Sequence, residues 1–243
     1  MNLYREQGVV LRTWKLGEAD RIVVLLTQGE GKVRAVAKGV RKTKSRFGGR
    51  LEPFSHVDLS LYRGRELDIV TQAEVISPFR ALREDYDRVV AGTAMLEAVD
   101  QVAQEREAAI RLYLLLVRAL RALDGGPRDP SVVLDAFLLK LMALEGYRPA
   151  LAECAGCGAS EQPPRCFSIV RGGGLCERCR TGQESTLETA TMPLLAALLG
   201  DDLDTTADAD PAPASRREVG ALVKGYVEYH LDRRLRAYPM VAR

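Results

Sequence analysis

The sequence predicts an α+β protein in two parts, a five-stranded N-terminal barrel followed by an α-helical domain. Two observations lead to this prediction: apolar residues follow strand-like patterns up to about residue 80, and they follow helical spacing from Ala81 onward. A third observation, two Cys-x-x-Cys pairs inside the helical part, predicts a zinc-ribbon-like insertion. We therefore place the domains at residues 1–80 and 81–243, with the insertion at residues 151–183.

Five segments of the first eighty residues have strand character. They are "GVVLRTW", "DRIVVLLTQ", "KVRAVAKGV", "FSHVDLSLY" and "ELDIVTQAEVI". The turn "GEG" joins the second and third as a hairpin, and a long connection follows the third. In the fourth segment, the residues expected to face inward are Phe54, Val57, Leu59 and Leu61. This arrangement predicts a small closed or partly open barrel of the OB type.

From Ala81 the spacing of apolar residues becomes helical. The helical segments are "LREDYDRVVAGTAMLEAVDQVA", "AAIRLYLLLVRALRAL" and "VVLDAFLLKLMALEG". One stripe of the first segment is formed by Leu82, Tyr86, Val89, Val90, Met95, Leu96 and Val99. The third segment is apolar on most sides, which predicts a helix buried at the centre of a bundle.

The C-terminal part contains an acidic stretch and one more helix. Residues 201–213 hold five aspartates and no cation, so we expect a solvated linker; the alternative is a mimic of nucleic acid that inhibits binding. Ser215 and Glu218 have the spacing of a capping box at the start of the last helix. Its apolar face is expected to comprise Val219, Leu222, Val223, Tyr226 and Val227.

The net charge of +2 conceals a local asymmetry. Residues 1–80 carry a balance of +6 and residues 81–243 a balance of −4. Eight cations and no acidic residue lie between positions 32 and 50: Lys32, Arg34, Lys38, Arg41, Lys42, Lys44, Arg46 and Arg50. A local cluster of this kind predicts contact with a polyanion, and we assign these eight residues to DNA binding. The alternative for the stretch "KGVRKTKSRFGGR" is a surface loop that is merely solvated.

The cysteines form the most specific motif of the chain. Cys154 and Cys157, then Cys176 and Cys179, are two Cys-x-x-Cys pairs separated by eighteen residues. Four thiolates at this spacing fit a tetrahedral Zn²⁺ site, and four protein ligands leave no open position, so the ion is expected to be structural. The fifth, Cys166, is expected to be a bystander; the alternative is a site that has lost its metal and keeps four free thiols.

Signatures of catalysis are weak. The "GEGK" stretch is not a phosphate-binding loop, because Leu26 and Val33 stand where glycine and a hydroxyl residue are needed. His56 and His230 have no metal-ligand neighbours at suitable spacing, and we expect both to be structural. The N-terminus lacks the pattern of a signal peptide and no apolar run is long enough for a bilayer, so we expect no membrane contact and a cytoplasmic, nucleoid-associated protein. We predict that the chain is not an enzyme.

The chain resembles the RecO family of bacterial recombination mediators over nearly all of its length. The resemblance is carried by "EQGVVLRTWKLGEADRIVVLLTQGEGKVRAVAKGVRK", "SRFGGRLEPFSHVDLSLYRG" and the cysteine region. It implies binding of single- and double-stranded DNA and annealing of complementary strands. It also implies action with RecR and with the single-stranded DNA-binding protein, so that RecA loads onto DNA. Some family members lack the cysteines, which agrees with a structural metal.

An OB barrel binds nucleic acid by cations along phosphates and aromatic rings under bases. Here the aromatic residues of the barrel are few: Tyr4, Trp14, Phe47, Phe54 and Tyr62, the last two expected in the core. We therefore expect sequence-independent phosphate binding. Leucines and valines near Arg111, Arg118 and Arg121 further predict a groove for the acidic, apolar tail of the single-stranded DNA-binding protein.

Three other classes of protein fit parts of the pattern. A zinc-ribbon accessory protein of transcription or translation would share the cysteines and the basic strands, but would not anneal DNA. A scaffold would hold partners through its helices. A metal-dependent nuclease would require magnesium and would degrade its substrate.

Overall fold

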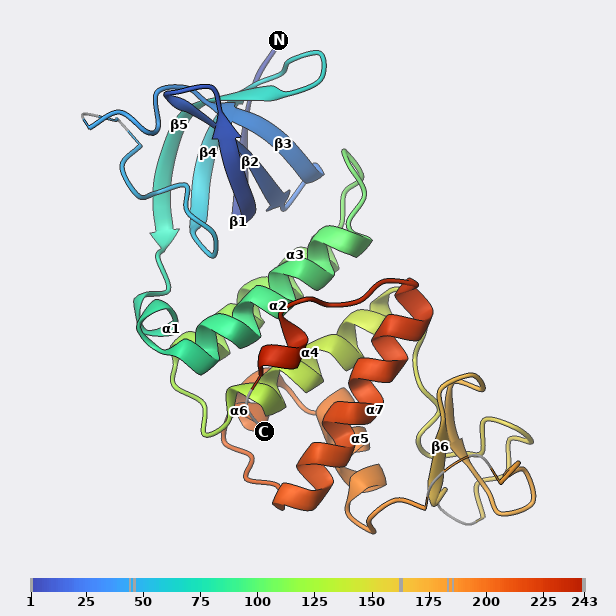
Figure 1. Cartoon of the computed structure of the whole chain (residues 1–243). Helices are drawn as coiled ribbons and strands as arrows, with labels where there is room; N and C mark the ends of the chain where they lie inside the picture. Colours follow the sequence, from blue (N-terminus) through green and yellow to red (C-terminus); the bar gives the residue numbers. More distant parts are fainter. Residues whose placement is uncertain are drawn as a thin grey trace.

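The computed structural model describes residues 2–241 except residues 44, 46, 162, 163, 183 and 185. Its N-terminal part is a closed barrel with the strand order β1-β2-β3-β5-β4, as Figure 1 shows at the blue end of the chain. The strands are β1 (Leu3–Leu16), β2 (Asp20–Thr27), β3 (Gly31–Ala37), β4 (His56–Tyr62) and β5 (Asp68–Ser77). The predicted barrel of the OB type is therefore confirmed.

Strict alternation of side chains explains the barrel core. In β3 the buried and half-buried positions alternate along the whole strand, because successive side chains point to opposite faces. Val57, Leu59 and Leu61 of β4 are completely buried in the barrel, as predicted. Tyr62 is not in the core, since its side chain is 45% exposed. It is the last residue of β4, where the strand leaves the barrel.

Phe54 is buried, but on a different side from the one expected. It lies just before β4 with a φ of 72°, and its ring packs with the helices rather than inside the barrel. Gly92 makes room for the ring, because a Cβ at this position would lie 2.9 Å from a ring carbon of Phe54. Phe54 thus attaches the barrel to the helical part.

The helices pack around α4, which is the central helix of the bundle. Their bounds are α1 (Arg80–Glu84), α2 (Tyr86–Val102), α3 (Ile110–Asp124), α4 (Pro130–Leu144), α5 (Thr191–Gly200), α6 (Leu203–Ala207) and α7 (Pro213–Leu231), with a short 3-10 turn η1 (Tyr238–Met240). Helix α4 contacts α2, α3, α5, α6 and α7, and eleven of its residues are buried. The prediction of a buried central helix is confirmed. In α2, by contrast, Tyr86 is 65% exposed, so it is not part of the buried stripe.

Part of the acidic stretch folds, contrary to the prediction of a linker. Asp202 accepts a hydrogen bond from the amide of Thr205 at 2.6 Å and begins α6. Leu203 and Thr206 are buried against the bundle. Because short polar residues stabilise helix starts, the aspartates here act as caps as well as surface charges.

The capping box predicted for the last helix is wrong. Helix α7 begins earlier, at Pro213, and Ser215 is buried within its first turn. The carboxylate of Glu218 instead accepts hydrogen bonds from Thr191 Oγ1 and from the amide of Glu188. Proline at the first helical position supplies the start signal in place of a side-chain cap.

The cysteine-rich excursion lies at the opposite end of the molecule from the barrel (Figure 1). Its two short strands, β6 (Cys166–Ser168) and β7 (Gly173–Leu175), form the predicted hairpin. Within the part of the chain that the structure describes, no helix has both the length and the apolar character needed to cross a bilayer.

Candidate nucleic-acid interface and metal centre

The basic connection between β3 and β4 has a buried anchor and an exposed surface. Phe47 and Leu51 are each about 1% exposed and belong to the barrel core. Lys38 and Lys42 are exposed, and within the described residues their side chains form no hydrogen bond or ion pair. Arg41 is exposed and donates to the carbonyl oxygens of the β1–β2 turn. The core residues therefore fix a loop whose charges face solvent.

The predicted DNA-binding residues fall into separate groups. Lys38, Arg41, Lys42 and Arg50 lie in this loop, and the guanidinium of Arg50 reaches the carbonyl oxygen of Ala73 at 3.4 Å. Lys44 and Arg46 are outside the described residues.

Lys32 and Arg34 lie instead at the junction with the helices. The ammonium of Lys32 donates to the carbonyl oxygen of Asp100 at 2.7 Å and lies 3.6 Å from its carboxylate. Arg34 pairs with Glu105 at 3.6 Å. This geometry gives Lys32, whose side chain is only 16% exposed, a structural role.

The junction also contains a buried polar network that the sequence did not reveal. Asp68 of β5 is fully buried and pairs with Arg106 at 3.0 Å, while it accepts hydrogen bonds from Tyr4 and from the amide of Gly64. Burial raises the pKa of Tyr4, and its hydrogen bond to Asp68 raises it further. These contacts connect two strands to the α2–α3 loop. No local sequence signal marks Asp68, because its partners are distant along the chain.

The barrel offers few rings for base stacking. Phe47 and Phe54 are buried, and Tyr4 is held by Asp68. The guanidinium of Arg12 lies 5.0 Å from the centre of the Trp14 ring. Tyr62 is the exception, with a largely exposed ring at the end of β4. The surface therefore favours contacts to phosphates over contacts to bases.

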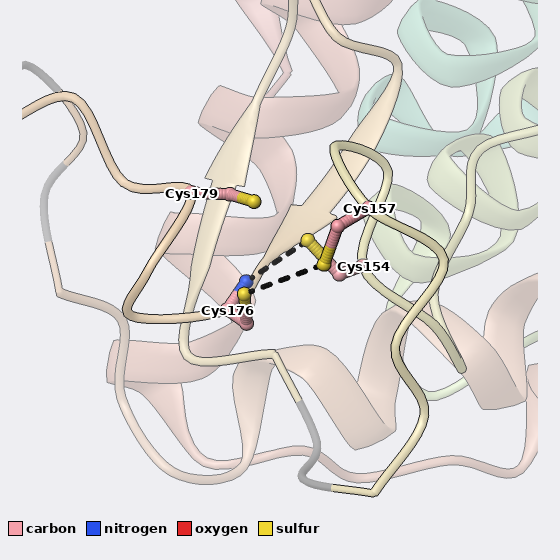
Figure 2. Close-up of side chains that lie close together, drawn as sticks. All are labelled: Cys154, Cys157, Cys176 and Cys179. Carbon is pink, nitrogen blue, oxygen red and sulfur yellow. Dashed lines mark hydrogen bonds between the residues drawn. The ribbon is translucent and has the colours of Figure 1, made fainter.

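The four predicted metal ligands lie together. Cys154 and Cys157 occupy one tight turn, and Cys176 and Cys179 follow β7 in a second. Their sulfur atoms all lie within 4.8 Å of one another, and Figure 2 shows them pointing toward a common centre. The distance from Cys157 Sγ to Cys176 Sγ is 3.8 Å, which is the edge expected for a tetrahedron with metal–sulfur bonds of about 2.3 Å.

Backbone amides around Cys154 favour the anionic form of its thiol, whereas the neighbouring thiols raise the pKa of Cys179. The amides of Cys176 and Gly156 donate to Cys154 Sγ at 3.3 and 3.4 Å. The Cys176 amide is the main cause that lowers the pKa of Cys154 to about 6. Glycine suits the crowded position 156, because a Cβ there would lie 3.0 Å from the Cβ of Cys179 and the neighbouring side chains would have to shift. The site thus fits a cation bound by thiolates.

Cys166 lies outside the cluster. It is buried on β6, where its thiol donates to the carbonyl oxygen of Leu175 at 3.6 Å, and burial raises its pKa. The neighbouring Phe167 packs edge-on against Tyr226 of α7, with ring centres 5.7 Å apart. The hairpin therefore packs on the helical bundle through its apolar face. The four clustered thiols lie away from this face.

A hollow of about 820 Å³ lies between α3, α4 and the α5–α6 segment; we call it the α3–α4 hollow. Its apolar lining includes Leu114, Leu115, Leu144 and Leu199. Its charged lining comprises five cations, Arg111, Arg118, Arg121, Lys140 and Arg148, and three carboxylates on the α5–α6 side, Asp201, Asp202 and Asp204. It thus contains all three arginines that the sequence analysis assigned to a tail-binding groove. Helices α5 and α6 complete the wall, and the sequence analysis did not predict either of them.

Both histidines are enclosed by aromatic residues. His56 Nε2 lies 2.7 Å from the hydroxyl of Tyr113, and His230 packs among Tyr147, Tyr226 and Tyr229. Burial lowers the pKa of both, that of His56 to about 4. The neutral rings contribute to packing, which agrees with structural roles.

Comparisons with known proteins identify the family of this chain. Residues 1–79 match the family model "Recombination protein O N terminal", and residues 83–239 match "Recombination protein O C terminal". The chain is 50% identical to "DNA repair protein RecO" of Nocardioides sp. over 99% of its length and all of the relative's. It is 48% and 47% identical to the proteins of that name from Frankia casuarinae and Thermobifida fusca, with full coverage of both chains. The chain therefore belongs to the RecO family of DNA repair proteins.

Proposed function

We propose that this protein binds single- and double-stranded DNA without sequence preference and anneals complementary strands. With RecR it helps RecA to load onto DNA covered by the single-stranded DNA-binding protein, in the cytoplasm at the nucleoid and without catalysis of its own. The observation that carries the proposal is the exposed basic loop anchored to the barrel by Phe47, in a chain whose relatives are DNA repair proteins. Family membership favours this role over the zinc-ribbon accessory role.

The chemistry of the loop matches the task of annealing. Two strands repel each other through their phosphates, and cations that are not already paired reduce this repulsion. Lys38 and Lys42 are such cations within the described part of the loop. An annealing protein must leave the base edges free to pair, and a surface with few accessible rings meets this requirement.

Salt dependence tests the DNA-binding part. At any one salt concentration, fluorescence anisotropy should give the same affinity for duplexes of unrelated sequence. For each duplex the affinity should fall as the salt concentration rises. Combining Lys38→Ala with Lys42→Ala should weaken binding equally for all of them and reduce the slope of log K against log salt by up to about 2, since each duplex contact contributes about 0.9. Substitution of the exposed Arg217 on α7 by Ala serves as the control. If the salt slope of the double variant equalled that of the wild type, the loop would be only a solvated surface and not a DNA-binding site.

We further propose the α3–α4 hollow as the site for the tail of the single-stranded DNA-binding protein. An acidic tail with apolar residues needs an apolar floor beside cations, and the hollow offers both. Arg111, Arg118, Arg121 and Arg148 are exposed, and among the described residues their guanidinium groups form no ion pair. Lys140 is already occupied, because its ammonium donates to the carbonyl oxygens of Leu198 and Leu199.

A labelled acidic peptide that ends in a C-terminal phenylalanine tests this site. Arg118→Glu should weaken its binding about tenfold, because the change replaces an attraction by a repulsion of similar size. Arg217→Glu, an exposed arginine on α7 away from the hollow, should leave the affinity unchanged. If Arg118→Glu and Arg217→Glu weakened peptide binding equally, the peptide would be attracted only by the overall charge of the protein and the proposed site would be wrong.

For the metal centre we propose one structural Zn²⁺ held by Cys154, Cys157, Cys176 and Cys179. The sulfur spacing and the amide hydrogen bonds support a thiolate site for a cation of this size. Such an ion would tie the two turns together and stabilise the excursion. It would leave no coordination position for substrate.

A further inference from the structure

A second hollow, of about 1160 Å³, opens where the barrel meets the helices; we call it the junction hollow. Its walls come from β1, from α2 and from the segment after α7. In Figure 1 that segment, in red, runs from the end of α7 back across the bundle. Pro53 and Phe54, at the end of the β3–β4 connection, also line it, whereas residues 38–50 and the lining of the α3–α4 hollow do not contribute.

The segment after α7 is held rigidly in place. Asp232 adopts a φ of 50°, which ends the helix and turns the chain. Leu235 and Tyr238 are then buried, and the hydroxyl of Tyr238 donates to the carboxylate of Asp135 at 2.7 Å. The amide of Ala237 donates to Glu97 at 3.1 Å. The exposed residues between Asp232 and Tyr238 are therefore held in a fixed position on the surface.

Three of the displayed residues are arginines. Arg233, Arg234 and Arg236 are exposed and line the junction hollow. Within the described residues they have no ion pair and no side-chain hydrogen bond, although Arg12, Arg21 and Arg63 all have carboxylate partners.

The acidic groups of the hollow are already engaged. The carboxylate of Asp100 lies 2.7 Å from Arg12 and 3.6 Å from Lys32, and Glu97 accepts the amide of Ala237. Four arginines and two carboxylates line the hollow, and only Asp100 is paired with cations, so the lining keeps a net positive charge and is complementary to an anion.

The lining between these charges is apolar. Phe54 and Leu96 form its floor but are only 7% and 4% exposed, so the accessible apolar surface is that of Met240, which stands at the margin with 57% of its surface exposed. Apolar side chains can support the face of an unstacked base, which a duplex would keep covered. Arg12 belongs to β1, so the hollow continues from the surface of the barrel.

We propose that the junction hollow binds a segment of single-stranded nucleic acid, with the phosphates on Arg233, Arg234 and Arg236 and a base against Met240 at its margin. This inference rests on the proposed DNA binding and extends it beyond the basic loop. The junction hollow would give the protein a second contact with one DNA strand, and this contact would require unpaired bases.

Methyl NMR of the full-length protein tests the inference directly. With ¹³C-methyl methionine, an oligo-dT titration should shift the signal of Met240, assigned by Met240→Leu. The buried Met95, Met142 and Met192 are internal controls whose signals should stay in place. A duplex of the same length should shift Met240 much less.

A triple variant with Ala at positions 233, 234 and 236 adds a second readout. It should remove the Met240 shift and lower the single-strand salt slope by about 2, since each contact contributes about 0.7. If oligo-dT binds the protein but the Met240 signal does not move, or moves only with an acidic peptide, the inference is overturned while the proposed function stands. Absence of all oligo-dT binding at low salt would overturn both.

Discussion

Single buried polar residues determine how the barrel is attached to the helices. His56 begins β4 and contacts Tyr113 of α3, so one hydrogen bond connects the two parts. A Cβ at Gly31, the first residue of β3, would lie 1.8 Å from the carbonyl oxygen of Glu107. These close contacts leave little room for movement at the junction.

The buried His56 predicts a pH-dependent stability. Its pKa falls from 6.5 to about 4, mainly through burial and also through the charge of Arg121. Folding favours the neutral ring, so its contribution is complete above pH 6.5 and is lost as the pH falls toward 4. Between pH 7.5 and pH 5 the wild type should lose about 2 kcal/mol more free energy of unfolding than His56→Gln. Urea unfolding at both pH values measures this difference.

Tyr113→Phe is the control for that experiment. It removes the hydrogen bond but keeps His56 buried, so it should lower stability at every pH by about 1 kcal/mol and retain the pH dependence. If His56→Gln had the same pH dependence as the wild type, burial of this ring would not be the cause.

At the metal centre, Cys154→Ser should remove the zinc. Metal analysis should find one zinc per wild-type chain and none in the variant, whose residues 150–183 should become sensitive to protease. Oligonucleotide binding by the barrel should remain. Cys166→Ser should keep its zinc, because Cys166 lies outside the cluster. Wild-type protein prepared without chelator and free of zinc would contradict the assignment.

At the scale of elements, the basic loop combines structural and surface residues. A sequence with six cations in thirteen positions gives no sign that one of its residues fills the barrel, yet Phe47 is almost fully buried. Phe47→Ala should therefore destabilise the fold by about 3–5 kcal/mol. Lys42→Ala, five residues away and exposed, should leave the unfolding midpoint unchanged. Equal stabilities of the two variants would mean that the loop is not part of the core.

Regular elements could be predicted wherever their own residues provide the pattern. The alternation of β3 and the apolar character of α4 identify both elements, and the spacing of the cysteines identifies the metal cluster. Helix α6 escaped prediction because five residues with only two buried side chains carry almost no periodic signal. The orientation of Phe54 and the position of Tyr62 depend on contacts with distant segments, which periodicity does not encode.

At the scale of the whole molecule, the candidate surfaces are separated. The basic loop extends from the barrel and the cysteine-rich excursion is at the far end of the molecule (Figure 1). The junction hollow lies between the barrel and the helices, and the α3–α4 hollow lies within the helical part. Val9 and Leu26 of the barrel and Phe54 next to it belong to the apolar core of the helices, and the interior of the barrel forms a second, separate core. In the proposed function, DNA and a protein partner would therefore bind at different positions on the same molecule.

The most direct test of this account is an annealing assay. Two complementary oligonucleotides with fluorescent labels are mixed with the protein, without nucleotide or magnesium, and duplex formation is followed by energy transfer. We expect strongly accelerated pairing at low salt, a smaller effect at high salt or after combined Lys38→Ala and Lys42→Ala substitution, and strands that remain intact. Pairing no faster than in the absence of protein, or strands that become shorter, would contradict the central claim.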